Sequence, residues 1–127
     1  MALSFAARLI DLTGLVSEVK DKEAVVVLSA EGRVIASDFN LSGRTTDWLE
    51  EVYELATTMA SLFQDSSVSG LDRALIEGSR KKLVVHRNQR RGDFVVIIGR
   101  ETMNIGLAGL IAKNISSAVE ATLEPKT

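Results

Sequence analysis

Two short stretches of this sequence are apolar without the alternation that a half-exposed strand shows. Val25–Leu28 and Phe94–Ile98 each carry an apolar side chain at every position. Because successive side chains of a strand point to opposite faces of the sheet, strands of this kind must be covered on both faces. The sequence therefore predicts helices on both sides of a sheet, which restricts the fold to a layered sandwich.

The rest of the chain supplies the other elements of such a sandwich. Hydrophobic periodicity predicts helices at about residues 3–20, 46–64 and 104–123, with a bend or break near Thr13 and Gly14 in the first. Strands are predicted at about residues 23–29, 34–37, 71–77, 82–87 and 93–99. The helix at residues 46–64 falls between the second and third strands, and short turns rich in glycine and polar residues connect the others. The order is α-β-β-α-β-β-β-α. We expect an α/β sandwich with a five-stranded, mostly antiparallel sheet and helices on both faces.

Length, charge and cysteine content exclude several classes of protein. The 127 residues suit one domain, and 15 basic against 17 acidic side chains argue against nucleic acid as the main ligand. The absence of cysteine excludes disulfides and thiolate metal sites. No apolar run is long enough to span a membrane, and the N-terminus lacks the basic region of a signal peptide. We expect a single-domain cytoplasmic protein.

The helix predicted at residues 46–64 carries two apolar stripes, although a core needs only one. The first stripe comprises Trp48, Val52, Leu55, Met59 and Leu62, and the second comprises Leu49, Tyr53, Ala56, Ala60 and Phe63. We assign the first stripe to the chain's own core and the second to a dimer interface, where Ala56 and Ala60 would allow close approach of a second helix. The alternative is a helix that is buried deep within its own domain.

The sequence shows no constellation typical of catalysis or of a bound cofactor. It lacks a phosphate-binding glycine loop and a Gly-x-Ser-x-Gly serine context. The single histidine, His86, lies in a predicted strand, where a half-exposed cross-strand residue is the alternative to a functional group. We expect no catalytic residues, no metal and no cofactor, and hence a protein that is not itself an enzyme.

Six basic residues fall within twelve positions, with no acidic residue among them. They are Arg80, Lys81, Lys82, Arg87, Arg90 and Arg91. One interpretation is a patch that docks on an acidic protein surface or on anionic lipid headgroups, which would allow peripheral membrane attachment. The other is protection of a sheet edge, because lysine and arginine discourage unwanted strand addition.

Several segments together resemble the roadblock family, named for a dynein light chain. The segment Val25–Ser37 resembles its apolar strand, acidic-glycine turn and returning strand, and Asn104–Ile111 resembles the opening of its last helix in prokaryotic members. Ala74–Gly78 and Leu83–Val85 fit its third and fourth strands. The likeness spans about residues 8–123 and rests on joint order and spacing. It implies one roadblock-like domain over residues 1–127, of a stand-alone prokaryotic type.

The resemblance also implies a function. Roadblock proteins form homodimers or heterodimers through the central helix and the third strand, and they act as non-catalytic regulators or scaffolds of small Ras-like GTPases. We therefore expect a dimer that binds such a GTPase, and we leave open whether it stimulates GTP hydrolysis. The candidate GTPase-binding residues lie on the polar rim of the central helix and are Glu50, Glu54, Thr57 and Ser61. Two alternatives remain, a structural tethering module without a nucleotide-dependent partner and a small-molecule sensory domain.

Overall fold

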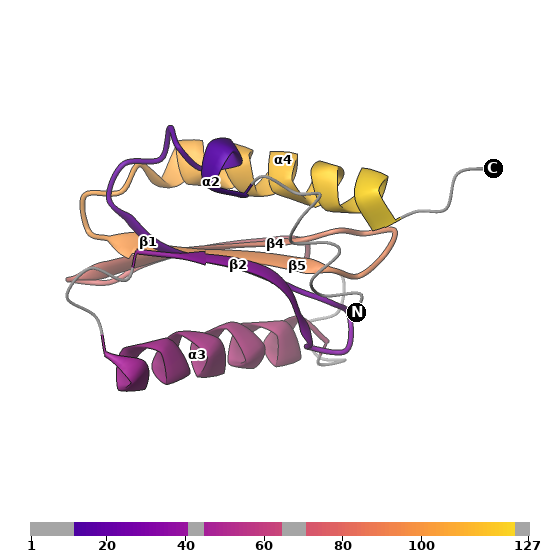
Figure 1. Ribbon diagram of the computed structural model, residues 1–127, viewed down its shortest axis with the longest axis horizontal. Helices are drawn as coiled ribbons and strands as arrows, with labels where there is room; N and C mark the ends of the chain where they lie inside the picture. The colour runs from indigo at the N-terminus through magenta and orange to yellow at the C-terminus, as the bar shows by residue number, and fades with distance from the viewer. Residues whose placement is uncertain (1–11, 41–44, 65–70, 124–127) are drawn as a thin grey trace.

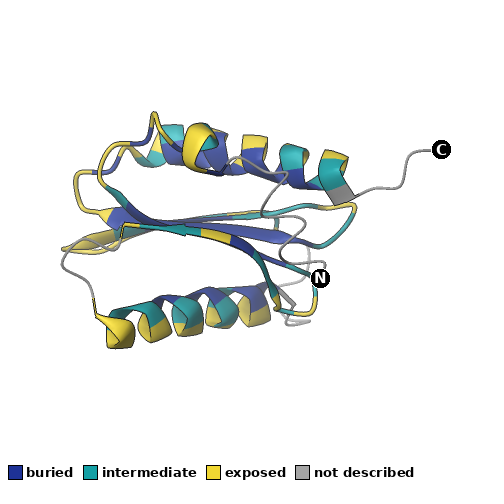
Figure 2. Cartoon of the chain, viewed as in Figure 1, coloured by how far each residue is buried: buried dark blue, intermediate teal, exposed yellow. Residues whose placement is uncertain are grey.

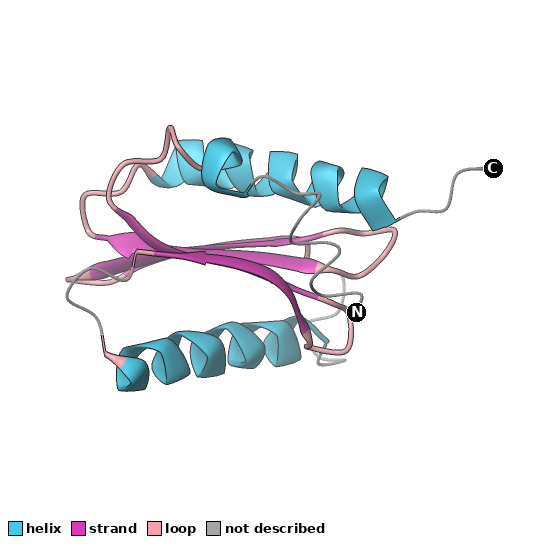
Figure 3. Cartoon of the chain, in the orientation of Figure 1, coloured by secondary structure: helices cyan, strands magenta, loops and turns pink. Residues whose placement is uncertain are grey.

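The computed structural model describes residues 12–40, 45–64 and 71–123 as a sheet between two helical layers (Figures 1 and 3). The elements are α2 (Leu12–Leu15), β1 (Lys22–Leu28), β2 (Val34–Phe39), α3 (Thr46–Gln64), β3 (Arg73–Glu77), β4 (Lys81–Arg87), β5 (Phe94–Arg100) and α4 (Ile105–Leu123). Helices α2 and α4 cover one face of the sheet, and α3 covers the other (Figure 1). The predicted fold class and element order are confirmed.

The sheet has the strand order β2-β1-β5-β4-β3. All four strand pairs are antiparallel, so the sheet is antiparallel throughout. The two strands without alternation, β1 and β5, lie at the centre and pair with each other, with Val26 opposite Val96. This central position explains their composition, because both faces of a central strand lie under a helical layer.

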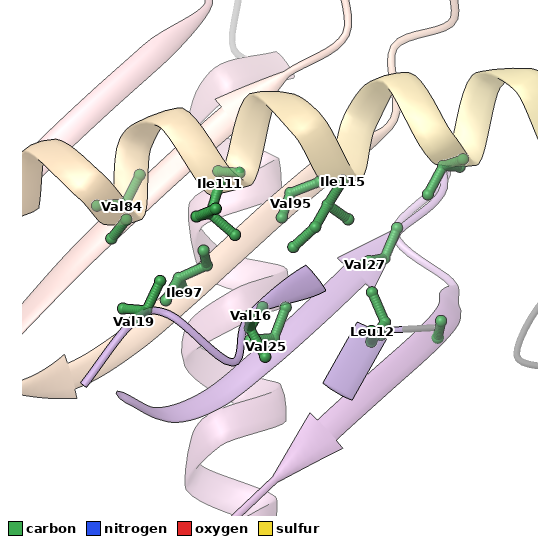
Figure 4. Packing of buried hydrophobic residues seen from close by; sticks show 14 of the residues in the cluster. Leu12, Val16, Val19, Val25, Val27, Val84, Val95, Ile97, Ile111 and Ile115 are labelled. Atoms are coloured by element: carbon green, nitrogen blue, oxygen red, sulfur yellow. The ribbon is translucent and has the colours of Figure 1, made fainter. Parts of the chain in front are cut away.

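Alternate residues of the central strands divide the interior into two clusters. Toward α4, Val25 and Val27 of β1 belong to the same buried cluster as Ile111 and Ile115 of the helix (Figure 4). Toward α3, Phe94 of β5 meets Phe63 edge to face, with 5.7 Å between ring centroids. Aromatic pairs prefer this edge-to-face arrangement, which fixes the C-terminal end of α3 over the sheet.

The first predicted helix ends earlier than expected. The described part of the helix, α2, ends at Leu15, and residues 16–20 form turns. The backbone carbonyl of Gly14 accepts hydrogen bonds from the amide and the hydroxyl of Ser17, at 3.3 and 2.9 Å. A serine side chain that competes for a backbone carbonyl in this way favours a turn over a continued helix. Val16 and Val19 are nevertheless fully buried, and the predicted residues 3–11 lie outside the described part of the chain.

No helix in the described part of the chain is both long enough and apolar enough to cross a membrane.

Candidate interaction surface

Helix α3 begins at a side-chain cap. The hydroxyl of Thr45 accepts a hydrogen bond from the backbone amide of Trp48 at 3.2 Å, which satisfies one of the free amides of the first turn. Asp47 lies in the same turn, where the helix dipole favours a negative charge. Thr45 is thus the N-cap of α3. The apolar residues of α3 determine which side of the helix faces the sheet.

The structure corrects the assignment of the two stripes of α3. Ala56, Ala60 and Phe63, predicted to face a partner, are buried in the chain's own core beneath the helix. The physical reason is the small size of alanine, which lets a helix approach the bulky side chains of a sheet closely. The two alanines therefore mark a helix-on-sheet contact, which the sequence analysis took for a helix-on-helix contact.

The other two residues of that stripe lie on a flank of α3. Tyr53 packs edge to face on Phe39 of β2, with 5.3 Å between ring centroids, and its hydroxyl lies 3.4 Å from Ser37 Oγ. Leu49, one helical turn earlier, is half-buried. Tyr53 is therefore held by the edge strand β2, which leaves little of this flank for a partner.

Figure 2 shows α3 with its buried positions toward the sheet and its exposed positions away from it. On the opposite flank of α3, the described residues leave apolar side chains partly uncovered: Leu55 and Met59 are half-buried, and Leu62 is 47% exposed. A groove of about 250 Å³ lies beside the N-terminal half of this flank, and its walls include Leu55, Leu83 of β4 and Ile98 of β5.

The sequence analysis assigned the first stripe of α3 to the core, and the assignment is confirmed for Val52, which is buried there. Leu55 and Met59 pack on the core only in part and Leu62 lies at the edge, because α3 packs mainly on β1 and leaves the α3-side face of β4 and β3 less covered.

Strand β3 adds an open backbone edge beside this flank. Among the described residues it pairs only with β4, and Ile76, on the same face as Leu83, is 39% exposed. The amide of Arg87 donates to the carbonyl of Asp72 at 2.7 Å, and that of Gly78 donates to the carbonyl of Lys81 at 2.8 Å. Because such pairs alternate along an antiparallel ladder, the backbone groups of residues 73, 75 and 77 point outward from the sheet. We define the α3–β3 surface as Leu55, Met59, Leu62, Ile76 and this backbone edge.

The four candidate GTPase-binding residues lie on the side of α3 that faces away from the sheet. Glu50, Glu54 and Ser61 are exposed. Thr57 is half-buried, and its hydroxyl donates to the backbone carbonyls of Tyr53 and Glu54, both at 3.0 Å. The two glutamates and Ser61 are accessible to a partner, whereas the hydroxyl of Thr57 is bound to its own helix.

The six basic residues do not form one patch. Arg80, Lys81 and Lys82 lie where β4 begins, and Arg87, Arg90 and Arg91 lie at or beyond its other end. Residues 83–86 of β4 separate the two groups, which puts Lys82 and Arg87 about 17 Å apart along the strand. Strand β4 is also an interior strand, so protection of a sheet edge by these residues is wrong as an interpretation.

Most of these basic side chains already have acidic partners within the chain. Lys81 pairs with the buried Glu23. The remaining ion pairs are Lys82 with Glu77 at 4.0 Å, Arg90 with Glu120 at 3.5 Å, and Arg91 with the buried Asp93 at 2.9 Å. The prediction of a continuous free basic patch is therefore wrong, because four of the six charges are offset locally.

His86 is half-buried on the α4-side face of β4 and lies opposite Arg73 of β3. Burial lowers the pKa of His86, and the nearby positive charges of Arg73 and Lys113 lower it further, while Asp72 opposes them. The neutral ring is thus favoured. Within the described residues, no group of three or more histidine, cysteine, aspartate or glutamate side chains could hold a metal ion.

The fold has close counterparts among solved structures. A Roadblock/LC7 domain from Streptomyces avermitilis aligns with a TM-score of 0.57 and 25% identity, over 87% of this chain and 92% of that chain. The chain has the roadblock fold. No protein-family model matches the sequence, and no curated protein matches it. The likeness is therefore carried by the arrangement of the elements far more than by sequence identity.

Two further structural neighbours are the proteins MglC and MglB, and MglB is described as a gliding protein. MglC from Myxococcus xanthus aligns with a TM-score of 0.63 and 15% identity, over 97% of this chain and 100% of that chain. The gliding protein MglB from Thermus thermophilus aligns with a TM-score of 0.69 and 19% identity, over 95% and 90%. At these identities the likeness establishes the fold alone, and it agrees with the expected resemblance to prokaryotic roadblock members.

Proposed function

We propose that this protein is a non-catalytic regulator or scaffold that acts in the cytoplasm as a dimer and binds a small Ras-like GTPase. The roadblock fold, shared with MglB and MglC, supports a regulatory or scaffolding role. The observation that carries the dimer is the α3–β3 surface, where an apolar helix flank and an open strand edge lie side by side.

The dimer follows from the chemistry of that surface. An exposed strand edge with unpaired backbone groups is a template for another strand. Two β3 strands that pair antiparallel about a two-fold axis would satisfy the outward groups of residues 73, 75 and 77 in both copies. The same arrangement would cover Ile76 and the groove beside Leu55 with the partner's side chains. One contact would thus satisfy both the backbone edge and the apolar flank.

The GTPase would bind the polar rim of the paired α3 helices. Glu50, Glu54 and Ser61 point away from the sheet and remain exposed when β3 edges pair. A small GTPase changes the order of its switch loops with the γ-phosphate, so a partner that contacts those loops distinguishes GTP from GDP. The proposed role therefore requires nucleotide-dependent binding.

The test is retention of Ras-like GTPases encoded in the same genome on the immobilised protein. Each GTPase is loaded with a non-hydrolysable GTP analogue or with GDP. We expect stronger retention of the GTP form, and loss of retention in Glu50→Lys/Glu54→Lys with no change in dimer mass. Glu18→Lys is the matched control, because Glu18 is equally exposed but lies in the opposite layer.

Three outcomes would redirect the proposal. Equal retention of both nucleotide forms would favour the tethering module, and no retention would remove the GTPase partner. A small molecule that copurifies with the protein would favour the sensory alternative. The GTP hydrolysis rate of a retained GTPase, measured with and without the protein, decides whether hydrolysis is stimulated.

A further inference from the structure

A second surface lies on the opposite face of the sheet, where α4 passes the β3 edge. Leu110 of α4 is 56% exposed and Leu75 of β3 is 51% exposed. Gly109, the residue before Leu110, is the point of close approach, because a Cβ atom built there would lie 4.0 Å from both Leu75 Cδ2 and Arg73 Nη1. Two large apolar side chains from different elements are therefore exposed at one crossing point.

The charges around these leucines are predominantly positive. Arg73 and Lys113 are exposed and have no ion-pair partner among the described residues. Lys82 lies 4.0 Å from Glu77, and Asp72 accepts a hydrogen bond from the neutral amide of Gln89 and keeps its negative charge. Arg73 and Lys113 outnumber this one unpaired carboxylate, so the charge beside the apolar pair has a cationic excess.

We propose that this α4–β3 surface, formed by Arg73, Leu75, Leu110 and Lys113, docks an acidic amphipathic segment of another protein. The apolar side chains of the segment would cover the two leucines, and its carboxylates would pair with Arg73 and Lys113. The proposal does not rest on GTPase binding, since this surface lies on the face opposite α3.

An anionic membrane is the less favoured occupant. Lipid recognition by charge typically uses clusters of four to eight lysine or arginine residues. Here only two cations flank two leucines, fewer than such lipid recognition uses. A protein segment is therefore the occupant that the surface fits.

His86 provides a built-in reporter for the docking of an acidic segment. The positive charges of Arg73 and Lys113 contribute to its lowered pKa. A carboxylate that pairs with either cation would oppose this effect and raise the pKa of the ring. Because His86 is the only histidine in the chain, its ring resonances report this change without overlap.

The experiment titrates the isotope-labelled full chain with two synthetic peptides. Both are amphipathic fourteen-residue helices with the same leucine stripe, and their polar positions carry either glutamate or lysine. We expect chemical-shift changes at residues 73–75, 86 and 109–113 with the glutamate peptide alone, together with a raised His86 pKa. Equal binding of the lysine peptide, or shifts confined to α3, would overturn the proposal.

Matched variants separate this surface from the rest of the molecule. Leu110→Ser and Lys113→Glu should each weaken binding of the glutamate peptide, by about tenfold or more for Leu110→Ser. Leu62→Ser removes a leucine of similar exposure from the α3–β3 surface, so it should weaken the dimer but leave the peptide affinity unchanged. Unaltered binding by Leu110→Ser would contradict the proposal. So would Lys113-dependent binding to phosphatidylserine vesicles without peptide binding, or a Leu110-dependent change in oligomeric mass.

Discussion

Gly99 shows how tightly a single residue is constrained at the end of a central strand. A Cβ atom at this position would lie 2.8 Å from the backbone carbonyl oxygen of Asp21 and would collide with Met103 Sδ. The backbone oxygen cannot rotate away as a flexible side chain does. The absence of a side chain at residue 99 is therefore a packing requirement of the β5–α4 connection.

We expect Gly99→Ala to lower the free energy of unfolding by about 1–3 kcal/mol, as overpacking typically does. Gly106→Ala is the matched control, because the nearest atom to its new Cβ is Asn104 Oδ1 at 3.5 Å. Alanine in a helix should be neutral or stabilising by up to about 1 kcal/mol at that position. Chemical denaturation of both variants measures the difference. Equal stability of the two variants would refute the packing argument.

His86 makes stability depend on pH in a defined direction. Burial and the neighbouring cations lower its pKa in the folded state below the ordinary value of 6.5. The unfolded chain therefore binds the proton more readily than the folded chain. The stability that the neutral ring of His86 contributes is fully present above about pH 6.5. It is lost as the pH falls through 6.5 toward the lower folded-state pKa.

Removal of the ring should reduce that dependence. Between about pH 7.5 and pH 5.5, the midpoint of thermal unfolding should fall further in the native protein than in His86→Gln. The comparison of the two proteins cancels the titration of carboxylates that they share. Parallel pH profiles would show that the neutral form of His86 gains nothing from folding.

At the scale of elements, β3 combines an inner and an outer set of backbone groups. Proline at residue 75 removes an amide that points outward, whereas proline at residue 76 removes one that bonds to β4. We expect Leu75→Pro to keep the fold and abolish the dimer, and Ile76→Pro to destabilise the fold by about 3 kcal/mol or more. Leu75→Ala retains the outward amide and should stay dimeric. Solution mass and circular dichroism of the three variants decide the matter.

Helix α3 offers a second contrast, between its buried stripe and its exposed flank. Ala60→Arg inserts an unpaired charge into the core and should cost about 3 kcal/mol or more of stability. Leu62→Arg changes an exposed residue, so stability should move by roughly 0.5 kcal/mol or less while the dimer dissociates. Denaturation curves together with solution mass measure both effects. A stable but monomeric Ala60→Arg protein would restore the stripe that the sequence analysis assigned to the interface.

The elements themselves follow closely from the sequence, because their signals are local. Unbroken apolar runs predict the central strands β1 and β5, and helical periodicity predicts α3 with the bounds observed. The direction in which α3 faces is not local. It depends on which stripe the sheet accepts, and the close fit of Ala56 and Ala60 against the sheet appears only when both layers are present.

At the scale of the whole molecule, the strand order decides whether residues that are close in sequence are also close in the structure. The six basic residues lie within twelve positions of the chain, yet β4 carries them to opposite ends of the sheet. Their acidic partners Glu23 and Glu120 come from distant elements. The clustering of charge in the sequence therefore predicted one patch. In the folded chain the antiparallel topology separates the basic residues into two groups and brings acidic partners to most of them.

The same topology creates the two surfaces from which the proposals start. Because β3 is last in the strand order, its edge is open, its α3-side face adjoins the apolar flank and its α4-side face adjoins Leu110. A dimer through that edge would join two sheets into one, cover the α3-side face of β3 and leave its α4-side face accessible. The central claim is therefore that a second copy of the chain covers the α3–β3 surface.

Light scattering of the purified protein across a concentration series tests this claim most directly. The account predicts a stable mass of twice the 13.8 kDa chain, and a mass of one chain for Leu62→Arg under the same conditions. A native protein that stays at the mass of one chain at every concentration would contradict the homodimer. It would leave the α3–β3 surface to a different partner.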